Sequence, residues 1–284
     1  MKLPLFPINQ PTDAGLIYPS SGHNAEFRRE QPDSISGLCA WYRSDDVVLS
    51  GSEVIQWNDR SGNDYHAVSP TVTQRPTYTF VDNPLGSQPC LVGDGVNDVM
   101  VTPSITQLTD VPAITTFCVQ YKTTATVGGL KIVWNLVATS GSTNLSLDAN
   151  FFYNTDNPTG LSFNFGSNPL PGLSSVAKID VIPTITTPFV TTTVWDRSAT
   201  TQATRFVPYI NGTVNTVTSV ADFDYTKKSF SSSPLQMFGR ASNNVFACPV
   251  RFAEMIIYNR ALTTAERQSV ERYLGSRYGI SVSS

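Results

Sequence analysis

The sequence is poor in charged residues. Only 14% of its 284 residues are charged, and 19 Lys and Arg against 22 Asp and Glu leave a net charge of −3. Proteins that bind nucleic acids need a basic stripe that neutralises phosphates, and the sequence has no such stripe. We therefore expect no nucleic acid among the partners of this protein.

Long apolar runs are also missing. No stretch of about 18 apolar residues occurs, so the sequence predicts no membrane-spanning helix and no membrane insertion. The first residues read MKLPLFPINQPTDAGLIYP, and Pro4, Pro7 and Pro11 interrupt any apolar core of a signal peptide. From this pattern we expect no secretion signal.

The four cysteines are Cys39, Cys90, Cys118 and Cys248. They lie far apart in the sequence and form no C-x-x-C pair, which argues against zinc and redox motifs. Cys39 and Cys118 stand in apolar, strand-like runs. We interpret them as buried thiols, not disulfides, of a protein made in a reducing compartment.

The N-terminal segment lacks a periodic apolar pattern. It holds five prolines and ends near the charged cluster EFRREQPD. Alone, such a segment is extended and mobile. We expect it to take a fixed shape only by lying on its own domain or on a neighbouring subunit. We therefore divide the chain into an extended arm, residues 1–35, and one domain, residues 36–284.

From residue 36 onward the pattern is typical of β-strands. Short runs rich in Val, Ile, Thr, Phe and Tyr recur between Gly, Pro, Asn and Asp, as in ITTFCVQYK and FVTTTVWD. Within YINGTVN, Asn211 and Gly212 can supply the positive φ that a type I′ hairpin turn needs. Strands at this spacing, with no helices between them, predict an antiparallel β-sandwich.

One helix is predicted near the end of the chain, within LTTAERQSVERYLGSRYGI. Thr263 is a suitable N-cap, and Glu266 three residues later completes a capping box. Gly279 can end the helix in the left-handed conformation. We expect the helix to pack on an edge or face of the sandwich through a short apolar stripe. That stripe consists of Val270, Tyr273 and Leu274.

The stretch WNDRSGNDYH, which begins at Trp57, has two interpretations. As a turn, Asp59 accepts backbone N–H groups and Gly62 takes a positive φ, while strand alternation places Ile55 with Trp57 on the core face. As a metal site, this loop and GDGVND meet at one rim and offer oxygen ligands to calcium. The candidate calcium ligands are Asp59, Asn63, Asp64, Asp94, Asn97 and Asp98.

Two stretches have the composition of glycan-binding loops, in which aromatic rings stand beside amides and carboxylates. NFFYNTDN contains Phe152, Tyr153, Asn154 and Asp156, and FDYTKK contains Tyr225 beside an aspartate. Aromatic packing at strand ends explains the same stretches without a ligand. The sequence leaves both interpretations open.

Several motifs together resemble the concanavalin A-like, laminin G-type jelly-roll domains. SGLCAWYRSDDVV, VIQWNDRSGNDYHAV, RPTY and CLVGDGVNDVM are similar to the opening of these domains, and Tyr209 to Gly212 to their Y-x-N-G hairpin. MFGRASNN and RFAEMIIYNRALTTAERQSVERYLGSRYGI resemble their closing pattern. The resemblance covers residues 36–281. It implies an all-β, antiparallel jelly-roll sandwich with one C-terminal helix, and some members bind calcium at the loop rim.

No catalytic constellation is recognisable. Glycosidases need two convergent carboxylates, and the Glu-x-Asp-x-x-Glu pattern of retaining enzymes on the resembled fold is absent. We interpret Glu254 as part of the closing pattern, Asp222 and Asp224 as a solvated strand end, and His66 as partly buried and hydrogen-bonded. Neither a G-x-S-x-G elbow nor a phosphate loop occurs. We therefore predict a non-enzymatic protein with no catalytic residue and no cofactor other than calcium.

The resembled fold carries lectins, glycan-binding modules, glycosidases and virion proteins, so fold alone does not decide the function. The arm and the missing secretion signal favour a phage virion accessory protein (capsid decoration, fibre or tail attachment), made in the host cytoplasm. Its arm would anchor it to other virion subunits in an oligomer or larger assembly, and its sandwich would bind host-surface glycans. The alternatives are a secreted carbohydrate-binding module or glycoside hydrolase, and an intracellular multimeric scaffold.

Overall fold

The structure is a computed structural model. The residues that it describes are 31–80, 85–122, 131–136, 149–153, 161–164, 176–179, 187–217, 229–241 and 246–283, and for the three short segments between 149 and 179 it describes the backbone. Almost all of the predicted arm therefore lies outside the described residues. The arm and its anchoring role stay predictions.

Strands dominate the described residues. The first eight are β1 (Leu38–Ser50), β2 (Glu53–Asp59), β3 (Ala67–Val68), β4 (Thr77–Thr79), β5 (Cys90–Val92), β6 (Met100–Ile105), β7 (Ala113–Lys122) and β8 (Lys131–Leu136). The others are β9 (Ala149–Tyr153), β10 (Leu161–Asn164), β11 (Val176–Ile179), β12 (Phe189–Asp196), β13 (Phe206–Ile210), β14 (Thr213–Val214), β15 (Ser233–Met237) and β16 (Val250–Tyr258). The helices are α1 (Gln202–Arg205), α2 (Thr264–Tyr278) and the 3₁₀ turns η1 (Pro32–Ser34), η2 (Val72–Gln74) and η3 (Thr106–Leu108).

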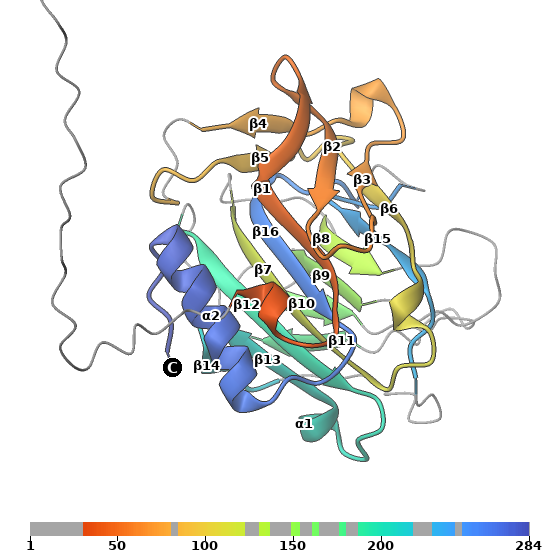
Figure 1. The fold of residues 1–284 in the computed structure, drawn as a ribbon, viewed down its shortest axis with the longest axis vertical. Helices are drawn as coiled ribbons and strands as arrows, with labels where there is room; N and C mark the ends of the chain where they lie inside the picture. The colour runs from red at the N-terminus through yellow and green to blue at the C-terminus, as the bar shows by residue number, and fades with distance from the viewer. Residues whose placement is uncertain are drawn as a thin grey trace, which may run out of the picture.

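The strands pair antiparallel in the order β11-β10-β9-β8-β15-β6-β3-β2-β4-β5-β16-β7-β12-β13-β14, and β1 pairs with both β16 and β2. The sheet folds over itself, so that β6, β8 and β15 lie across a shared core from β7, β12 and β16 (Figure 1). The prediction of an all-β fold with a C-terminal helix is confirmed in the described residues. The jelly-roll connectivity stays a prediction.

Two apolar clusters lie on the two faces of the β7–β12–β16 layer. The first fills the space between the layers and includes Trp57, Phe189 and Phe252. The second lies on the opposite face, under helix α2, and includes Trp41 and Tyr258. Figure 1 shows α2 lying over β12, on the outside of this layer. The molecule is therefore layered as helix, sheet and sheet, as expected for an amphipathic element covering an apolar sheet face.

Helix α2 has the ends that the sequence predicts. The Thr263 side chain accepts the backbone N–H of Glu266, and the Glu266 carboxylate accepts the backbone N–H of Thr263 at 2.9 Å. The Arg260 guanidinium beside it helps to lower the pKa of Glu266 to about 2. Gly279 ends the helix at φ 67°. The helix buries the predicted stripe of Val270, Tyr273 and Leu274 against the sheet.

The hairpin at Asn211 and Gly212 is also confirmed. Their φ angles are 49° and 79°, and they join β13 to β14. The C-terminal residues return to this turn, because the Ser283 N–H donates to the Asn211 carbonyl oxygen at 2.7 Å. A Cβ at position 212 would lie 2.1 Å from the Ser283 carbonyl oxygen, so the close approach requires glycine as well as the positive φ.

The prediction that Ile55 shares a face with Trp57 is wrong. Opposite β1, Val48 pairs with Gln56 and Leu49 with Val54, so Ile55 is an extra residue on β2. This β-bulge reverses the alternation and places Val54 in the core with Trp57, while Ile55 is only half-buried. Strand alternation predicts a face only where the ladder is regular.

All four cysteines are buried free thiols, which confirms the prediction for Cys39 and Cys118. Burial raises the pKa of each thiol, for example that of Cys90 to about 11. They therefore pack as small apolar side chains and are poor nucleophiles at neutral pH. Among the described residues, no helix has both the length and the apolar character needed to cross a membrane.

Candidate functional site

The loop after β2 is organised by the carboxylate of Asp59. Its Oδ1 accepts the N–H groups of Trp41 and Ser61, both at 2.9 Å. Its Oδ2 accepts the Tyr65 N–H at 3.0 Å and the Ser61 hydroxyl at 2.8 Å. Gly62 takes φ 86°, as the turn interpretation predicts. Asp59 therefore holds the loop in shape by accepting these hydrogen bonds, and few lone pairs of its carboxylate remain for another ligand.

Tyr65 stands at the rim of the sheet in a fixed position. Its hydroxyl lies 2.7 Å from the Thr106 hydroxyl and donates to Gln107 Oε1 in a short contact, and it accepts the Thr106 N–H at 3.1 Å. Its carbonyl oxygen accepts the Tyr42 hydroxyl at 2.5 Å. The ring is half-buried, with exposed Thr106 beside it. The result is a rigid aromatic side chain between two loops, which we call the Tyr65 rim.

Two titratable side chains flank Tyr65 in the sequence. Asp64 has φ 59°, and its side chain is 88% exposed. His66 accepts the Asp59 N–H through Nδ1 at 3.0 Å, and its Nε2 lies 3.9 Å from Asp64 Oδ1. His66 is therefore partly buried and hydrogen-bonded, as predicted. The loop that positions Tyr65 therefore also carries an exposed carboxylate and a partly exposed imidazole.

The loop between β5 and β6 has its own acidic pair. Asp94 Oδ1 accepts the N–H groups of Val96, Asn97 and Asp98 at 2.8 to 3.3 Å. Asp98 Oδ2 accepts the Asp94 N–H at 2.8 Å. The pKa of Asp98 is raised to about 7, mainly by burial and in smaller part by the nearby carboxylates of Asp94 and Glu53. This carboxyl group is therefore protonated over much of the acidic range.

The raised pKa of Asp98 predicts in which direction the stability of the protein changes with pH. Folded Asp98 holds its proton up to about pH 7, whereas the unfolded chain releases it near about pH 4, so stability falls as the pH rises between these values. Asp98→Asn keeps the acceptor and removes the charge. We expect it to raise the melting temperature relative to the native protein at about pH 8 and to have little effect at about pH 4. Thermal melts at both pH values measure this.

Exposed Asp64→Asn is the control and should shift neither melt. An equal effect of Asp98→Asn on the melting temperature at both pH values would contradict the raised pKa of Asp98.

Thermal melts also test the calcium prediction, because a bound cation favours the ionised form of a carboxylate ligand and so stabilises the folded protein. Calcium should then raise the melting temperature of the native protein at neutral pH, and a chelator should reverse the change.

The six predicted calcium ligands divide between the two loops. Asp59, Asn63 and Asp64 belong to the first loop and Asp94, Asn97 and Asp98 to the second. In the part of the chain that the structure describes, no three His, Cys, Asp or Glu side chains form a group that could hold a metal ion. The main function of Asp59 and Asp94 in this structure is to accept backbone N–H groups. Calcium binding stays a prediction.

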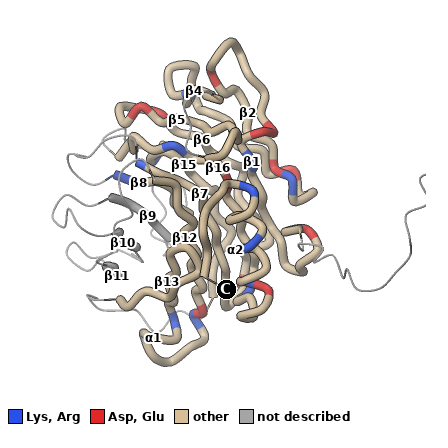
Figure 2. The backbone as a smooth tube through the Cα atoms, turned by 90° about the vertical axis from the view of Figure 1, so that its left-hand side faces the viewer, with Lys and Arg blue, Asp and Glu red and all other residues tan. Residues whose placement is uncertain are grey.

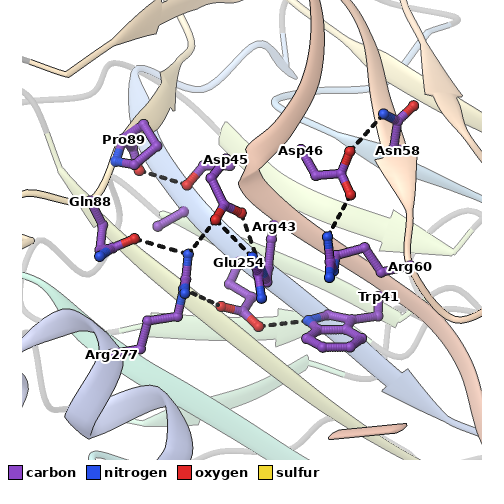
Figure 3. A network of polar contacts seen from close by, with 12 residues as sticks. Trp41, Arg43, Asp45, Asp46, Asn58, Arg60, Gln88, Pro89, Glu254 and Arg277 are labelled. Carbon is purple, nitrogen blue, oxygen red and sulfur yellow. Dashed lines mark hydrogen bonds and ion pairs between the residues drawn. The ribbon is translucent and has the colours of Figure 1, made fainter. Parts of the chain in front are cut away.

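A second polar cluster is centred on Glu254, which is completely buried under α2. Its Oε1 accepts the Trp41 indole N–H at 2.6 Å and the Tyr273 hydroxyl at 3.1 Å, and its Oε2 accepts the Tyr278 hydroxyl at 2.7 Å. Arg277 Nε lies 3.6 Å from Oε2 (Figure 3). Burial raises the pKa of Glu254, although these donors partly offset it.

Sequence reasoning did not find the partners of Glu254. A bulge in β16 at Ala253, where Phe252 and Glu254 pair with consecutive residues of β7, turns the carboxylate toward α2. Arg277 extends the network to Asp45, at 2.8 Å, and Asp45 also binds Arg43. With no exposed surface, the Glu254 carboxyl fits a role in holding α2 to the sheet, consistent with its interpretation as part of the closing pattern.

The other predicted residues lie outside the described part. Nothing is described of Asn154, Asp156 and Tyr225, nor of the side chains of Phe152 and Tyr153 in β9. Asp222 and Asp224 are likewise outside it, as is His23. Where charges are described, Figure 2 shows a mostly uncharged tube on which short basic and acidic stretches are interspersed. The prediction of a glycan site in residues 150–157 therefore stays a prediction.

No protein-family model and no curated protein matches this chain. Solved structures of similar fold include a Trypanosoma rangeli sialidase in complex with 2,3-difluorosialic acid, with 13% identity, a TM-score of 0.55 and coverage of 85% of this chain and 33% of the sialidase. The receptor-binding domain of botulinum neurotoxin D has 9% identity, a TM-score of 0.55 and coverage of 85% of this chain and 53% of that chain. The serotype D ligand-binding domain in complex with N-acetylneuraminic acid has a TM-score of 0.52, 9% identity and coverage of 85% and 51%.

These likenesses support a lectin-type β-rich fold, and identities this low show the fold alone. The chain spans one third of the sialidase and about half of the botulinum chains. Nothing in the comparisons supports a phage or virion origin.

The prediction that the protein is not an enzyme is contradicted, because sialidases are among its structural neighbours. The sequence lacks the Glu-x-Asp-x-x-Glu pattern, which argues only against one type of retaining glycosidase and not against catalysis as such. The non-enzymatic assignment is therefore withdrawn.

Proposed function

We propose that this protein is a carbohydrate-binding β-sandwich and that the Tyr65 rim is where it holds a glycan. The observation that carries the proposal is the fixed position of the Tyr65 ring, whose hydroxyl is held by Thr106 and Gln107 across the loop. An aromatic face packs against the apolar C–H face of a sugar ring, and neighbouring polar groups bind its hydroxyls. Asp64 and His66 supply such groups.

The fold likeness supports the same class of function. The sialidases process sialic-acid derivatives, and one botulinum domain is seen with N-acetylneuraminic acid. Sialylated glycans are therefore the first ligands to test. A virion accessory role depends on residues 1–34, of which nearly all lie outside the described residues, and it stays a separate prediction.

Tyr65→Ala tests the proposal. We expect the native protein to bind a subset of glycans on an array, with sialylated ones included, and Tyr65→Ala to weaken that binding by about 30-fold, as for a hot-spot residue worth about 2 kcal/mol. Tyr65→Phe keeps the ring and loses the hydroxyl contacts, so its loss should be smaller. Titration calorimetry with the best array glycan measures both.

Tyr78→Ala is the matched control, because Tyr78 is also partly buried against the core but lies on β4. It should leave glycan affinity unchanged. Equal affinity of the native protein and Tyr65→Ala would exclude the Tyr65 rim. A native protein that binds no glycan on the array would contradict the proposed function itself.

A further inference from the structure

The backbone of Gln107 is fixed at the Tyr65 rim. Gln107 lies in the 3₁₀ turn η3, whose last residue, Leu108, is 1% exposed and belongs to the core between the layers. The Gln107 carbonyl oxygen accepts an N–H of the Asn259 side chain at 3.3 Å, across 152 positions of the sequence. The core and a distant segment of the chain therefore fix the point from which the Gln107 side chain extends.

The other end of the Gln107 side chain is fixed by Tyr65. The Tyr65 hydroxyl carries one proton, and it donates this proton to Gln107 Oε1. The oxygen side of the amide is therefore turned toward Tyr65, and the Nε2 protons are turned away from it. Because Oε1 and Nε2 belong to one small planar group, the Nε2 donor stays close to the Tyr65 hydroxyl and has a defined direction.

The Nε2 group of Gln107 remains open to another molecule. Gln107 is partly exposed, and within the described residues no protein group accepts from its Nε2. The nitrogen is not one of the buried, unpartnered atoms of that part of the chain, so solvent reaches it. A donor that is already fixed in direction loses less conformational entropy on binding than a donor on a free side chain.

Thr106 places an acceptor beside this donor. Since the only proton of the Tyr65 hydroxyl goes to Gln107, the Thr106 hydroxyl is the donor in its 2.7 Å contact with Tyr65. The exposed Thr106 Oγ1 lies 3.4 Å from Gln107 Oε1, and its lone pairs stay available to accept. A fixed donor and an acceptor therefore lie next to each other at the Tyr65 hydroxyl.

We propose that Gln107 determines which sugar the Tyr65 rim selects, by binding one hydroxyl group of a sugar ring that packs on Tyr65. A hydroxyl accepts and donates at once, so it accepts from Gln107 Nε2 and donates to Thr106 Oγ1. A sugar that lacks this hydroxyl leaves both protein groups without a partner, and the site discriminates against it. The Tyr65 hydroxyl acts as the positioning group for the amide. The inference rests on the proposed function, because it takes the Tyr65 rim as the glycan site.

Gln107→Glu tests the proposal, because it keeps an acceptor for the Tyr65 hydroxyl and replaces the Nε2 donor with an acceptor. Titration calorimetry of the full chain measures affinity for galactose, N-acetylglucosamine and N-acetylneuraminic acid, and then for monodeoxy analogues of the sugar that binds best. We expect one analogue to bind the native protein about tenfold more weakly than its parent sugar, as for one lost hydrogen-bonded group. In Gln107→Glu this ratio should fall to about one, because the two changes remove the same interaction. Its melting temperature should stay that of the native protein.

Tyr65→Phe tests the positioning role of the hydroxyl. It keeps the aromatic ring and releases the Gln107 amide, so the ratio between parent sugar and analogue should fall more than the affinity for the parent sugar. Two-dimensional NMR shows the release without any sugar. The two side-chain N–H signals of Gln107 should move in Tyr65→Phe toward the positions of a freely exposed glutamine, and unchanged signals would contradict the positioning role.

The matched control is Gln74→Glu. Gln74 is also partly exposed in a 3₁₀ turn, η2, and its Oε1 accepts the Thr71 hydroxyl at 3.0 Å. This variant should keep the native affinity and the native ratio. The proposal is overturned if no analogue binds more weakly than its parent sugar, or if Gln107→Glu keeps the native ratio. A loss of affinity in Tyr65→Ala would then leave the Tyr65 rim standing without it. Binding of none of the three sugars also overturns the proposal, and the glycan array then decides whether the proposed function fails with it.

Discussion

Glu254→Ala should lower the free energy of unfolding by about 3–5 kcal/mol. Alanine removes the acceptor for the Trp41 indole N–H and for the hydroxyls of Tyr273 and Tyr278, and it takes a partner from Arg277. The three neutral donors, on Trp41, Tyr273 and Tyr278, are buried, so each loses a hydrogen bond that water does not replace. Helix α2 should therefore loosen from the sheet.

Urea unfolding followed by circular dichroism measures this loss. Glu254→Gln keeps one acceptor oxygen and should lose less than alanine does. The control is Glu53→Ala, because the Glu53 side chain is 43% exposed and lies 3.4 Å from Arg75, a surface pair worth about 1 kcal/mol or less. A loss for Glu254→Ala as small as for Glu53→Ala would show that the Glu254 network does not hold α2.

Glu271→Ala should be nearly as destabilising, by about 3–5 kcal/mol. Glu271 is completely buried, accepts the Thr192 hydroxyl at 2.9 Å and forms a short ion pair with Arg267. Arg267 also lies over the Tyr209 ring, 3.8 Å from its centroid. Without Glu271, a buried guanidinium keeps its charge and loses its anionic partner.

The double variant Arg267→Met/Glu271→Leu tests whether the loss of stability comes from the unpaired charge of Arg267 or from lost packing. Well-packed apolar side chains replace a buried ion pair with little change in stability, so we expect it to recover most of the loss of Glu271→Ala. Urea unfolding of both variants decides the point. A double variant as unstable as Glu271→Ala would show that packing, not the unpaired charge, causes the loss.

Features that depend on near neighbours were predictable from the sequence. The capping box joins Thr263 to Glu266, and the hairpin turn needs only Asn211 and Gly212, so local residue types determine both. The Asx-turn at Asp59 follows for the same reason. Such features involve residues only a few positions apart, so they form independently of the tertiary contacts of the chain.

The candidate sites depend on contacts that no local pattern encodes. Tyr65 meets Thr106 across 41 positions, and Trp41 meets Glu254 across 213. The extra residues Ile55 and Ala253 redirect the faces of their strands, and a bulge leaves no clear trace in apolar alternation. The enzyme prediction was wrong for a related reason, since a missing motif excludes only the chemistry of that motif.

Saturation-transfer NMR with the native protein and its best array glycan tests the central claim most directly, because it shows which sugar protons contact the protein. We expect strong saturation transfer from the protein to the ring protons of one sugar. This transfer should be lost in Tyr65→Ala and kept in Tyr78→Ala. Undiminished transfer in Tyr65→Ala, or no transfer to any glycan in the native protein, would contradict it.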